Sequence, residues 1–124
     1  MAELHESIIR TFRKRFLSRG FKEAKSPIAT FLPDFFAQKQ GRNSGILQQV
    51  VVEAEIQSTL FKPHTAEQLI LMDEYIRLMR RKRVTVLGFL LVPNRYQTKL
   101  QAKLLISSLF PQGTSILIKY GNEK

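Results

Sequence analysis

Residues 46–57 have the sequence ILQQVVVEAEIQ, and they decide the fold of the chain. Their centre, Val50 to Val52, is β-branched, which disfavours a helix and favours a strand. Side chains alternate along a strand, so one face carries Val50, Val52, Ala54 and Ile56, and the other carries Val51, Glu53, Glu55 and Gln57. The stretch therefore predicts a long strand with three polar side chains on one otherwise apolar face.

The segment before this strand predicts its pairing partner. Residues 28–37 are apolar and aromatic, which favours an extended segment, and they contain Asp34 directly after Pro33. Residues 41–45, Gly-Arg-Asn-Ser-Gly, form a turn signal between the two segments. Together these features predict a β-hairpin whose two strands are joined by that loop.

Two helices are expected on either side of the hairpin. Residues 4–19 have apolar side chains at helical spacing and end at Gly20, which suits a helix C-terminus. A second helix is expected to begin near Pro63 and to run to about Lys82. Within it, Thr65 and Gln68 match a capping box.

The last part of the chain adds two strands and a helix. Residues 84–92 are apolar on both faces, which predicts a strand in the middle of a helix-covered sheet. Residues 98–110 predict a helix with Leu100 and Leu104 among its inward side chains. Residues 115–120 predict a short strand near a sheet edge.

The length and the order of these elements set the fold class. The 124 residues are 44% hydrophobic, which is typical of one globular domain over residues 1–124. The predicted order is helix, strand, strand, with room for a third strand, then helix, strand, helix, strand. This order predicts an α/β fold with a mixed β-sheet flanked by helices.

The chain is strongly basic, with 20 Lys and Arg against 10 Asp and Glu and a net charge of +10. Such an excess favours a polyanionic partner, most often nucleic acid. The basic residues gather at 10–25 and at 77–83, where they would attract a phosphate backbone. The candidates for DNA binding are Arg10, Arg13, Lys14, Arg42, Arg80, Arg81, Lys82 and Arg83.

Composition also narrows the compartment. The sequence has no cysteine, which excludes disulfides, thiol catalysis and thiolate metal sites. No apolar run reaches the length of about 18 residues that a membrane span needs. The N-terminus has charges where a signal peptide would have its apolar core. We expect a cytoplasmic protein that has no membrane partner.

Three carboxylates stand out because they lie in apolar segments of a basic chain. If the hairpin pairs the segment of Asp34 with the strand of Glu53 and Glu55, these groups converge, and they repel one another unless a cation lies between them. Oxygen ligands of this kind suit Mg²⁺ or Mn²⁺. A divalent ion in a basic field favours phosphodiester hydrolysis. The structural alternative is that Asp34 belongs to a turn and that the polar residues of the strand face solvent.

Pro33-Asp34, followed by Glu55-Ile56-Gln57 at the end of the next strand, resembles the motif of the PD-(D/E)xK nuclease superfamily. That superfamily includes restriction endonucleases, archaeal Holliday junction resolvases and transposon endonucleases. Over residues 4–120 the resemblance implies a restriction-endonuclease-like fold and a metal-dependent DNA endonuclease that acts in recombination, transposition, restriction or repair. It also implies that Asp34 and Glu55 bind Mg²⁺ or Mn²⁺, and that Glu6 of the first helix supplies a further acid.

The chain departs from that motif at Gln57, where the family has a lysine that orients or polarises the attacking water. A glutamine amide can orient a water but carries no charge. Two alternatives are open: the register Glu53-Ala54-Glu55, which makes the motif E-x-E, and a cation supplied by Lys39 or Lys62. In some relatives a functional glutamine lies near the start of the following helix, where this chain has Gln68.

Three interpretations therefore compete. The protein is a metal-dependent endonuclease with Asp34, Glu55 and Gln57 or Glu53 at its active site; or it has the nuclease fold without catalysis and binds DNA as an assembly factor; or it is an unrelated α/β protein whose charge meets RNA or an acidic protein. For the nuclease we consider a homodimer, which would bring a site to each DNA strand, and a protein partner that would supply sequence specificity.

Overall fold

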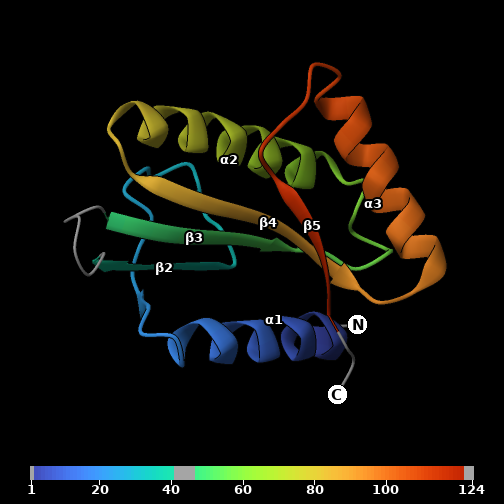
Figure 1. Cartoon of the computed structure of the whole chain (residues 1–124). Coiled ribbons are helices and arrows are strands. Elements are labelled where there is room, and N and C mark those ends of the chain that lie inside the picture. Colours follow the sequence, from blue (N-terminus) through green and yellow to red (C-terminus); the bar gives the residue numbers. More distant parts are fainter. Residues whose placement is uncertain (1, 41–46, 122–124) are drawn as a thin grey trace.

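The computed structural model describes residues 2–40 and 47–121 (Figure 1). Its helices are α1 (Ala2–Leu17), α2 (Pro63–Arg81) and α3 (Tyr96–Leu109). Its strands are β1 (Lys22–Glu23), β2 (Phe35–Gln40), β3 (Leu47–Ala54), β4 (Thr85–Pro93) and β5 (Leu117–Gly121). The predicted element order is confirmed, and β1 is the third strand for which the sequence left room.

The strands form one mixed sheet in the order β1-β2-β3-β4-β5. Strands β1 and β2 and strands β2 and β3 pair antiparallel, whereas β4 is parallel to β3 and β5 is parallel to β4. In Figure 1, α1 covers one face of this sheet, and α2 and α3 cover the other. The predicted α/β class, a mixed sheet flanked by helices, is confirmed.

Strand β3 is buried on both of its faces. Val50 and Val52 belong to a core with Phe12 of α1. Val51, which points the other way, belongs to a second core with Met72 of α2. Burial of a side chain of this size stabilises the fold by about 1.5–3 kcal/mol. The β-branched run therefore forms a strand because both of its faces have a helix to pack against.

Strand β4 confirms the expected position in the middle of the sheet. Phe89 and Leu91 belong to the core under α1, and Leu90 and Val92 belong to the core under α2 and α3. Strand β5 lies at the sheet edge, as expected. The parallel β3–β4 pair thus lies between two layers of helices, which is where near-continuous apolar strands are found.

The predicted hairpin is also confirmed. Strands β2 and β3 pair with Phe35 opposite Val52. Just before the first residue of β2, the N–H of Asp34 also donates to the carbonyl of Val52, at 2.9 Å. Asp34, directly before the paired residues, lies close enough to Glu53 for their carboxyl groups to interact. The connecting loop, residues 41–46 with the candidate Arg42, lies outside the described residues.

The extended segment expected over residues 28–37 is a strand only from Phe35 onward. The residues just before it form bends and turns because a side chain takes over their hydrogen bonds. Gln68 of α2 accepts the N–H of Leu32 at 2.9 Å and donates to the carbonyl of Thr30 at 3.2 Å. Backbone groups that are satisfied in this way have no need of a strand partner.

The capping box expected from Thr65 and Gln68 is wrong. The N-cap of α2 is Lys62, which makes no side-chain capping bond, and Pro63 begins the helix. The Thr65 hydroxyl instead donates to the carbonyl of Thr59 at 2.9 Å. Both residues serve tertiary contacts, because the segments before and beside the helix start lie within their reach.

The buried face of α3 is narrower than the sequence predicts. Leu100 and Leu104 are 43% and 65% exposed, whereas Ala102 and Leu105 are buried. Helix α3 lies toward one side of the sheet (Figure 1), so only a narrow stripe of it meets the core.

No described helix is both long enough and apolar enough to cross a membrane.

Gly88 of β4 provides a test of how closely α2 packs on the sheet. A Cβ atom added there would lie 2.6 Å from Cδ1 of Ile76 and 3.1 Å from Sδ of Met72. We expect Gly88→Ala to lower the free energy of unfolding by about 1–3 kcal/mol, because these side chains must leave their packed rotamers. Urea unfolding measures the change. Thr85→Ala, at an exposed position of the same strand, is the control and should stay within about 0.5 kcal/mol. A fully stable Gly88→Ala variant would contradict the close approach of α2.

Candidate functional site

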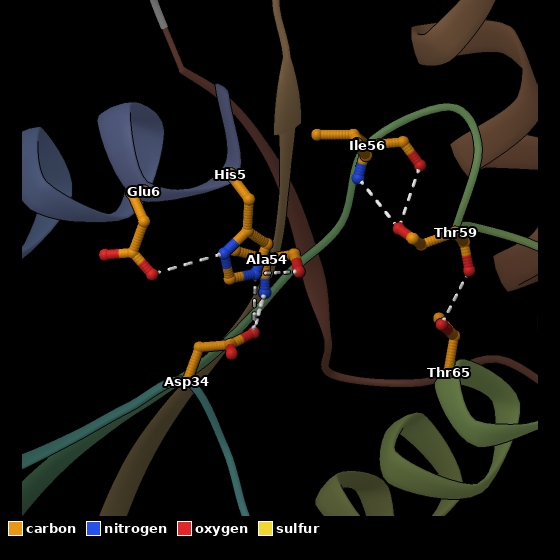
Figure 2. Close-up of polar contacts among 7 residues, drawn as sticks. All are labelled: His5, Glu6, Asp34, Ala54, Ile56, Thr59 and Thr65. Carbon is orange, nitrogen blue, oxygen red and sulfur yellow. Dashed lines mark hydrogen bonds and ion pairs between the residues drawn. The ribbon is translucent and has the colours of Figure 1, made fainter. Parts of the chain in front are cut away.

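Asp34 lies directly before β2, at the end of the sheet where β3 ends. Its Oδ2 accepts the backbone N–H of Ala54 at 2.7 Å (Figure 2). Its own N–H donates to the carbonyl of Val52 at 2.9 Å. These two bonds hold both the backbone and the carboxylate of Asp34 against β3, so the position of this acid is set by the hairpin.

Glu53 interacts with the carboxyl group of Asp34 and is only 4% exposed. Its pKa rises from the ordinary value of 4.5 to about 10, chiefly because burial disfavours the charged form. The neighbouring carboxyl groups of Asp34 and then Glu55 raise that pKa further, as like charges and as hydrogen-bond partners of the protonated form. Glu53 is therefore protonated at neutral pH. Its Oε2 atom is buried and has no hydrogen-bond partner among the described residues.

Glu55 follows β3 and is 7% exposed. Its N–H donates to the carbonyl of Leu91 at 2.9 Å, which extends the β3–β4 pairing past Ala54 and keeps Glu55 on the face of Glu53. Glu55 lines a cleft of about 430 Å³ between the start of α1 and the start of α2. The other residues that line it are His5, Glu6, Ile56, Ser58, Thr59, Lys62, His64 and Thr65. Glu55 is thus the member of the acidic group that meets this cleft.

His5 is a site residue that the sequence analysis missed. Its Nε2 donates to the carbonyl of Ala54 at 2.9 Å and lies 3.5 Å from Oδ2 of Asp34, and its Nδ1 lies 3.9 Å from Oε1 of Glu6 (Figure 2). These contacts tie the first turn of α1 to the end of β3. No local pattern signals a contact between residues so far apart in the chain.

The two remaining site candidates, Glu6 and Gln57, are exposed. The Glu6 side chain is 64% exposed and lines the same cleft as Glu55. Gln57 is exposed in the turn after β3, beyond the end of the paired residues. The structure therefore brings together Asp34, Glu53 and Glu55, but not Gln57.

Gln68 holds the segment of chain that leads to Asp34. Its two bonds to the backbone of Thr30 and Leu32 shape the segment that enters β2, and the side chain is buried. Asp34 follows that segment directly and also lines a second cleft of about 460 Å³, formed mainly by residues 23–36. A glutamine near the start of α2 thus positions the chain before the acid rather than capping the helix.

The chemistry of the acidic group fits a hard divalent cation. Carboxylate oxygens are the ligands that Mg²⁺ prefers, and the buried Oε2 of Glu53 lacks a partner that a cation would supply. Within residues 4–40 and 47–121, no three His, Cys, Asp or Glu side chains are arranged to hold a metal ion together. Mg²⁺ keeps several waters and commonly takes only one or two carboxylates. An adjacent pair such as Asp34 and Glu53 suits it.

The first basic cluster begins close to the acidic group. Arg10 and Lys14 are exposed on α1, whose first turn contacts Asp34 through His5. Arg13 is less available, because its Nε pairs with Oε1 of Glu23 at 3.3 Å and its guanidinium lies 5.9 Å from the centre of the Phe35 ring. Arg10 and Lys14 are therefore the better placed of the three for contact with an anion.

The second basic cluster lies at the opposite end of the sheet. Residues 80–83 come directly before β4, whose first residue, Thr85, pairs with Gln48 at the start of β3. Leu91 of β4 pairs with Ala54 beside the acids, so the two ends lie about 20 Å apart at the usual rise per residue. A hollow of about 800 Å³ at this far end, lined in part by Arg19, Lys22 and Lys39, holds none of the three carboxylates.

Comparisons of this chain with family models, with curated proteins and with solved structures give no match.

The pKa of Glu53 predicts that the stability of the protein falls as pH rises. In the unfolded chain Glu53 ionises near 4.5, whereas in the folded protein it keeps its proton up to about 10. Unfolding therefore releases this proton between those values, and the free energy of unfolding falls across that window. We expect Glu53→Gln to gain up to about 4 kcal/mol over the wild type between about pH 5 and pH 8, because the variant has no such proton to release.

Urea unfolding at the two pH values in metal-free buffer measures this gain. Glu67→Gln, at an exposed position of α2, is the matched control and should show the same difference from wild type at both pH values. An equal difference for Glu53→Gln at both pH values would mean that Glu53 is not held protonated in the folded protein.

Proposed function

We propose that this protein is a metal-dependent DNA endonuclease with a restriction-endonuclease-like fold. The observation that carries the proposal is the meeting of Asp34, Glu53 and Glu55 at the end of β3, in a chain whose net charge is +10. Adjacent acids next to an exposed cleft suit a divalent cation, and the positive charge suits a polyanionic substrate.

The geometry favours the E-x-E register of the motif. In this register Asp34 and Glu53 are the ligand pair, and Glu55 takes the place that lysine has in the family. Two observations support it: the carboxyl groups of Asp34 and Glu53 interact, and Gln57 is exposed beyond the strand. Under the E-x-Q register the buried Glu53 would have no role.

The residues divide the work of hydrolysis among them. Bound Mg²⁺ or Mn²⁺ would activate water and stabilise negative charge on the phosphate. Asp34 and Glu53 would hold the ion, and Glu53 would give up its proton on binding it. Glu55 faces the cleft, where its carboxylate would orient the attacking water and accept a proton from it. The water oxygen then bonds to phosphorus while the bond to the leaving oxygen breaks, and that oxygen takes up a proton.

The basic clusters would hold the DNA backbone. Phosphate contacts fix the position of a protein on DNA but carry no sequence information, so a protein partner would supply sequence specificity. Duplex DNA has two strands, and a homodimer would bring one site to each of them. Recombination, transposition, restriction and repair all use such a reaction.

Cleavage of labelled linear and branched DNA with Mg²⁺, Mn²⁺ or EDTA tests the proposal. We expect the wild type to cut only with metal. Asp34→Asn, Glu53→Gln and Glu55→Gln should each lower the single-turnover rate constant by about a hundredfold or more at matched DNA binding, because each removes charge from the metal site. Glu67→Gln is the charge-matched control. Gln57→Ala distinguishes the registers, since it should cut normally only if E-x-E is the working motif.

Two outcomes would contradict this proposal. If the wild type and the variants bind DNA but nothing cuts, the protein is a nuclease-fold DNA-binding or assembly protein without catalysis. If nothing binds DNA, the net charge serves another partner, such as RNA or an acidic protein.

The salt dependence of DNA binding tests the role of the two clusters. We expect Arg10→Gln with Lys14→Gln to lower the slope of log Kd against log salt by about one to two, since each lost phosphate contact removes about one. Arg81→Gln with Lys82→Gln should do so only for DNA long enough to span the roughly 20 Å between the acids and the far end of the sheet. Lys103→Gln, exposed on α3, is the control. An unchanged slope for both pairs would contradict this path of the DNA.

A further inference from the structure

The cleft beside Glu55 is lined by acidic side chains that disfavour an anionic substrate. Glu53, which is protonated and adds no charge, lies nearby, and the walls of the cleft include the acids Glu6 and Glu55. A phosphodiester is itself an anion, so these groups repel it unless positive charge lies beside it. In the E-x-E register Glu55 holds the position where the family has lysine, and Gln57 is neutral and exposed in the turn after β3, so the motif supplies no positive charge.

The structure separates the two lysines that the sequence offered in its place. Lys39 lies near the far end of β2, opposite Gln48 at the start of β3. Its Nζ donates to the carbonyl of Arg19 at 3.1 Å and lies 4.6 Å from the centre of the Phe21 ring. Lys39 therefore packs at the end of the sheet away from the acids, whereas Lys62 lines the cleft together with Glu55.

The backbone of Lys62 is held firmly in the turn that joins β3 to α2. Its N–H donates to the carbonyl of Thr59 at 3.1 Å, and its carbonyl accepts the N–H of Thr65 at 3.0 Å. The Thr65 hydroxyl donates to the same Thr59 carbonyl at 2.9 Å (Figure 2). Pro63 follows as the first residue of α2, with its φ angle set by its ring.

The charge on Lys62 is available for a ligand. The side chain is exposed, and no ion pair or hydrogen bond of its amine occurs within the described residues. The helix dipole of α2 adds partial positive charge at its N-terminus. No acidic residue in the first turn of this helix offsets that charge. His64 also lines the cleft.

We propose that Lys62 is a catalytic residue that contacts the scissile phosphodiester in the cleft and supplies the positive charge that the E-x-E motif lacks. This inference rests on the proposed nuclease function. The amine acts as a fixed charge on a non-bridging phosphate oxygen, so no proton transfer is assigned to it. The substrate enters with its phosphate between the carboxylates at the end of β3 and the start of α2.

The first arm of the test is cleavage. Lys62→Gln should lower the single-turnover rate constant by about a hundredfold, because one preorganised donor to the reacting phosphate is lost. DNA affinity should change by less than about tenfold, since most phosphate contacts remain. Lys39→Gln removes the same charge from the competing lysine and should cut at the wild-type rate. Thermal unfolding of each variant checks that it is folded.

The second arm measures the contact without catalysis. The dinucleotide phosphodiester TpT is titrated into each protein with Ca²⁺, and amide chemical shifts are followed by NMR. We expect shifts at residues 55–65 in the wild type and in Lys39→Gln, and their loss in Lys62→Gln.

The outcomes separate this inference from the nuclease proposal. If the wild type cuts and Lys62→Gln cuts equally fast, Lys62 is not catalytic and the nuclease proposal stands. If nothing cuts but TpT shifts residues 55–65 in a Lys62-dependent way, the phosphodiester contact stands and hydrolysis does not. If TpT leaves residues 55–65 unshifted in the wild type, or shifts them equally in Lys62→Gln, the contact itself is overturned.

Discussion

The antiparallel pairing of β2 with β3 is the contact on which the other features of this protein depend. It sets Phe35 opposite Val52, and Asp34, which bonds to the Val52 carbonyl and the Ala54 N–H, lies close to Glu53. A shift of the register by one residue would turn every side chain of β2 to the other face. Asp34 would then leave Glu53, and Phe35 would leave the core under α1. The two cores and the acidic group therefore depend on the same register.

The buried carboxyl group of Glu53 lowers the stability of the fold around this hairpin. A carboxyl group buried to 4% exposure is unfavourable, and Glu53 meets that cost by keeping its proton. The surrounding strands offset the loss, since β3 and β4 bury apolar side chains on both faces. His5 adds a direct link from α1 to the Ala54 carbonyl, so the end of β3 is held from the helix side as well. Polar groups held at a cost to stability are typical of functional sites.

The acids lie where three elements with different tasks meet. The end of β3 carries the carboxyl groups, the first turn of α1 supplies His5, and the start of α2 supplies Lys62. His5 and Asp34 are anchored by their side chains to backbone groups of Ala54, whereas Lys62 is anchored by its backbone to Thr59. The anchor of Lys62 therefore leaves its amine out of the contact. The far end of the sheet has the opposite character, with the basic residues 80–83 and no member of the acidic group.

By itself, the sequence determined the order of the elements, the hairpin and the doubly buried strands, because these follow from apolar spacing and β-branching, which are local properties. It also singled out Asp34, Glu53 and Glu55, since acids in apolar strands are conspicuous. Only the tertiary structure decided how they combine. Asp34 meets Glu53 because its backbone and its carboxylate both bond to β3, which no local pattern encodes. Gln68 serves the segment before Asp34 instead of its own helix, and His5 reaches Ala54 across the fold. The sequence alone does not distinguish Lys39 from Lys62. Because of the direction of the strands, the two lysines lie at opposite ends of the sheet, and only Lys62 lies in the cleft beside Glu55.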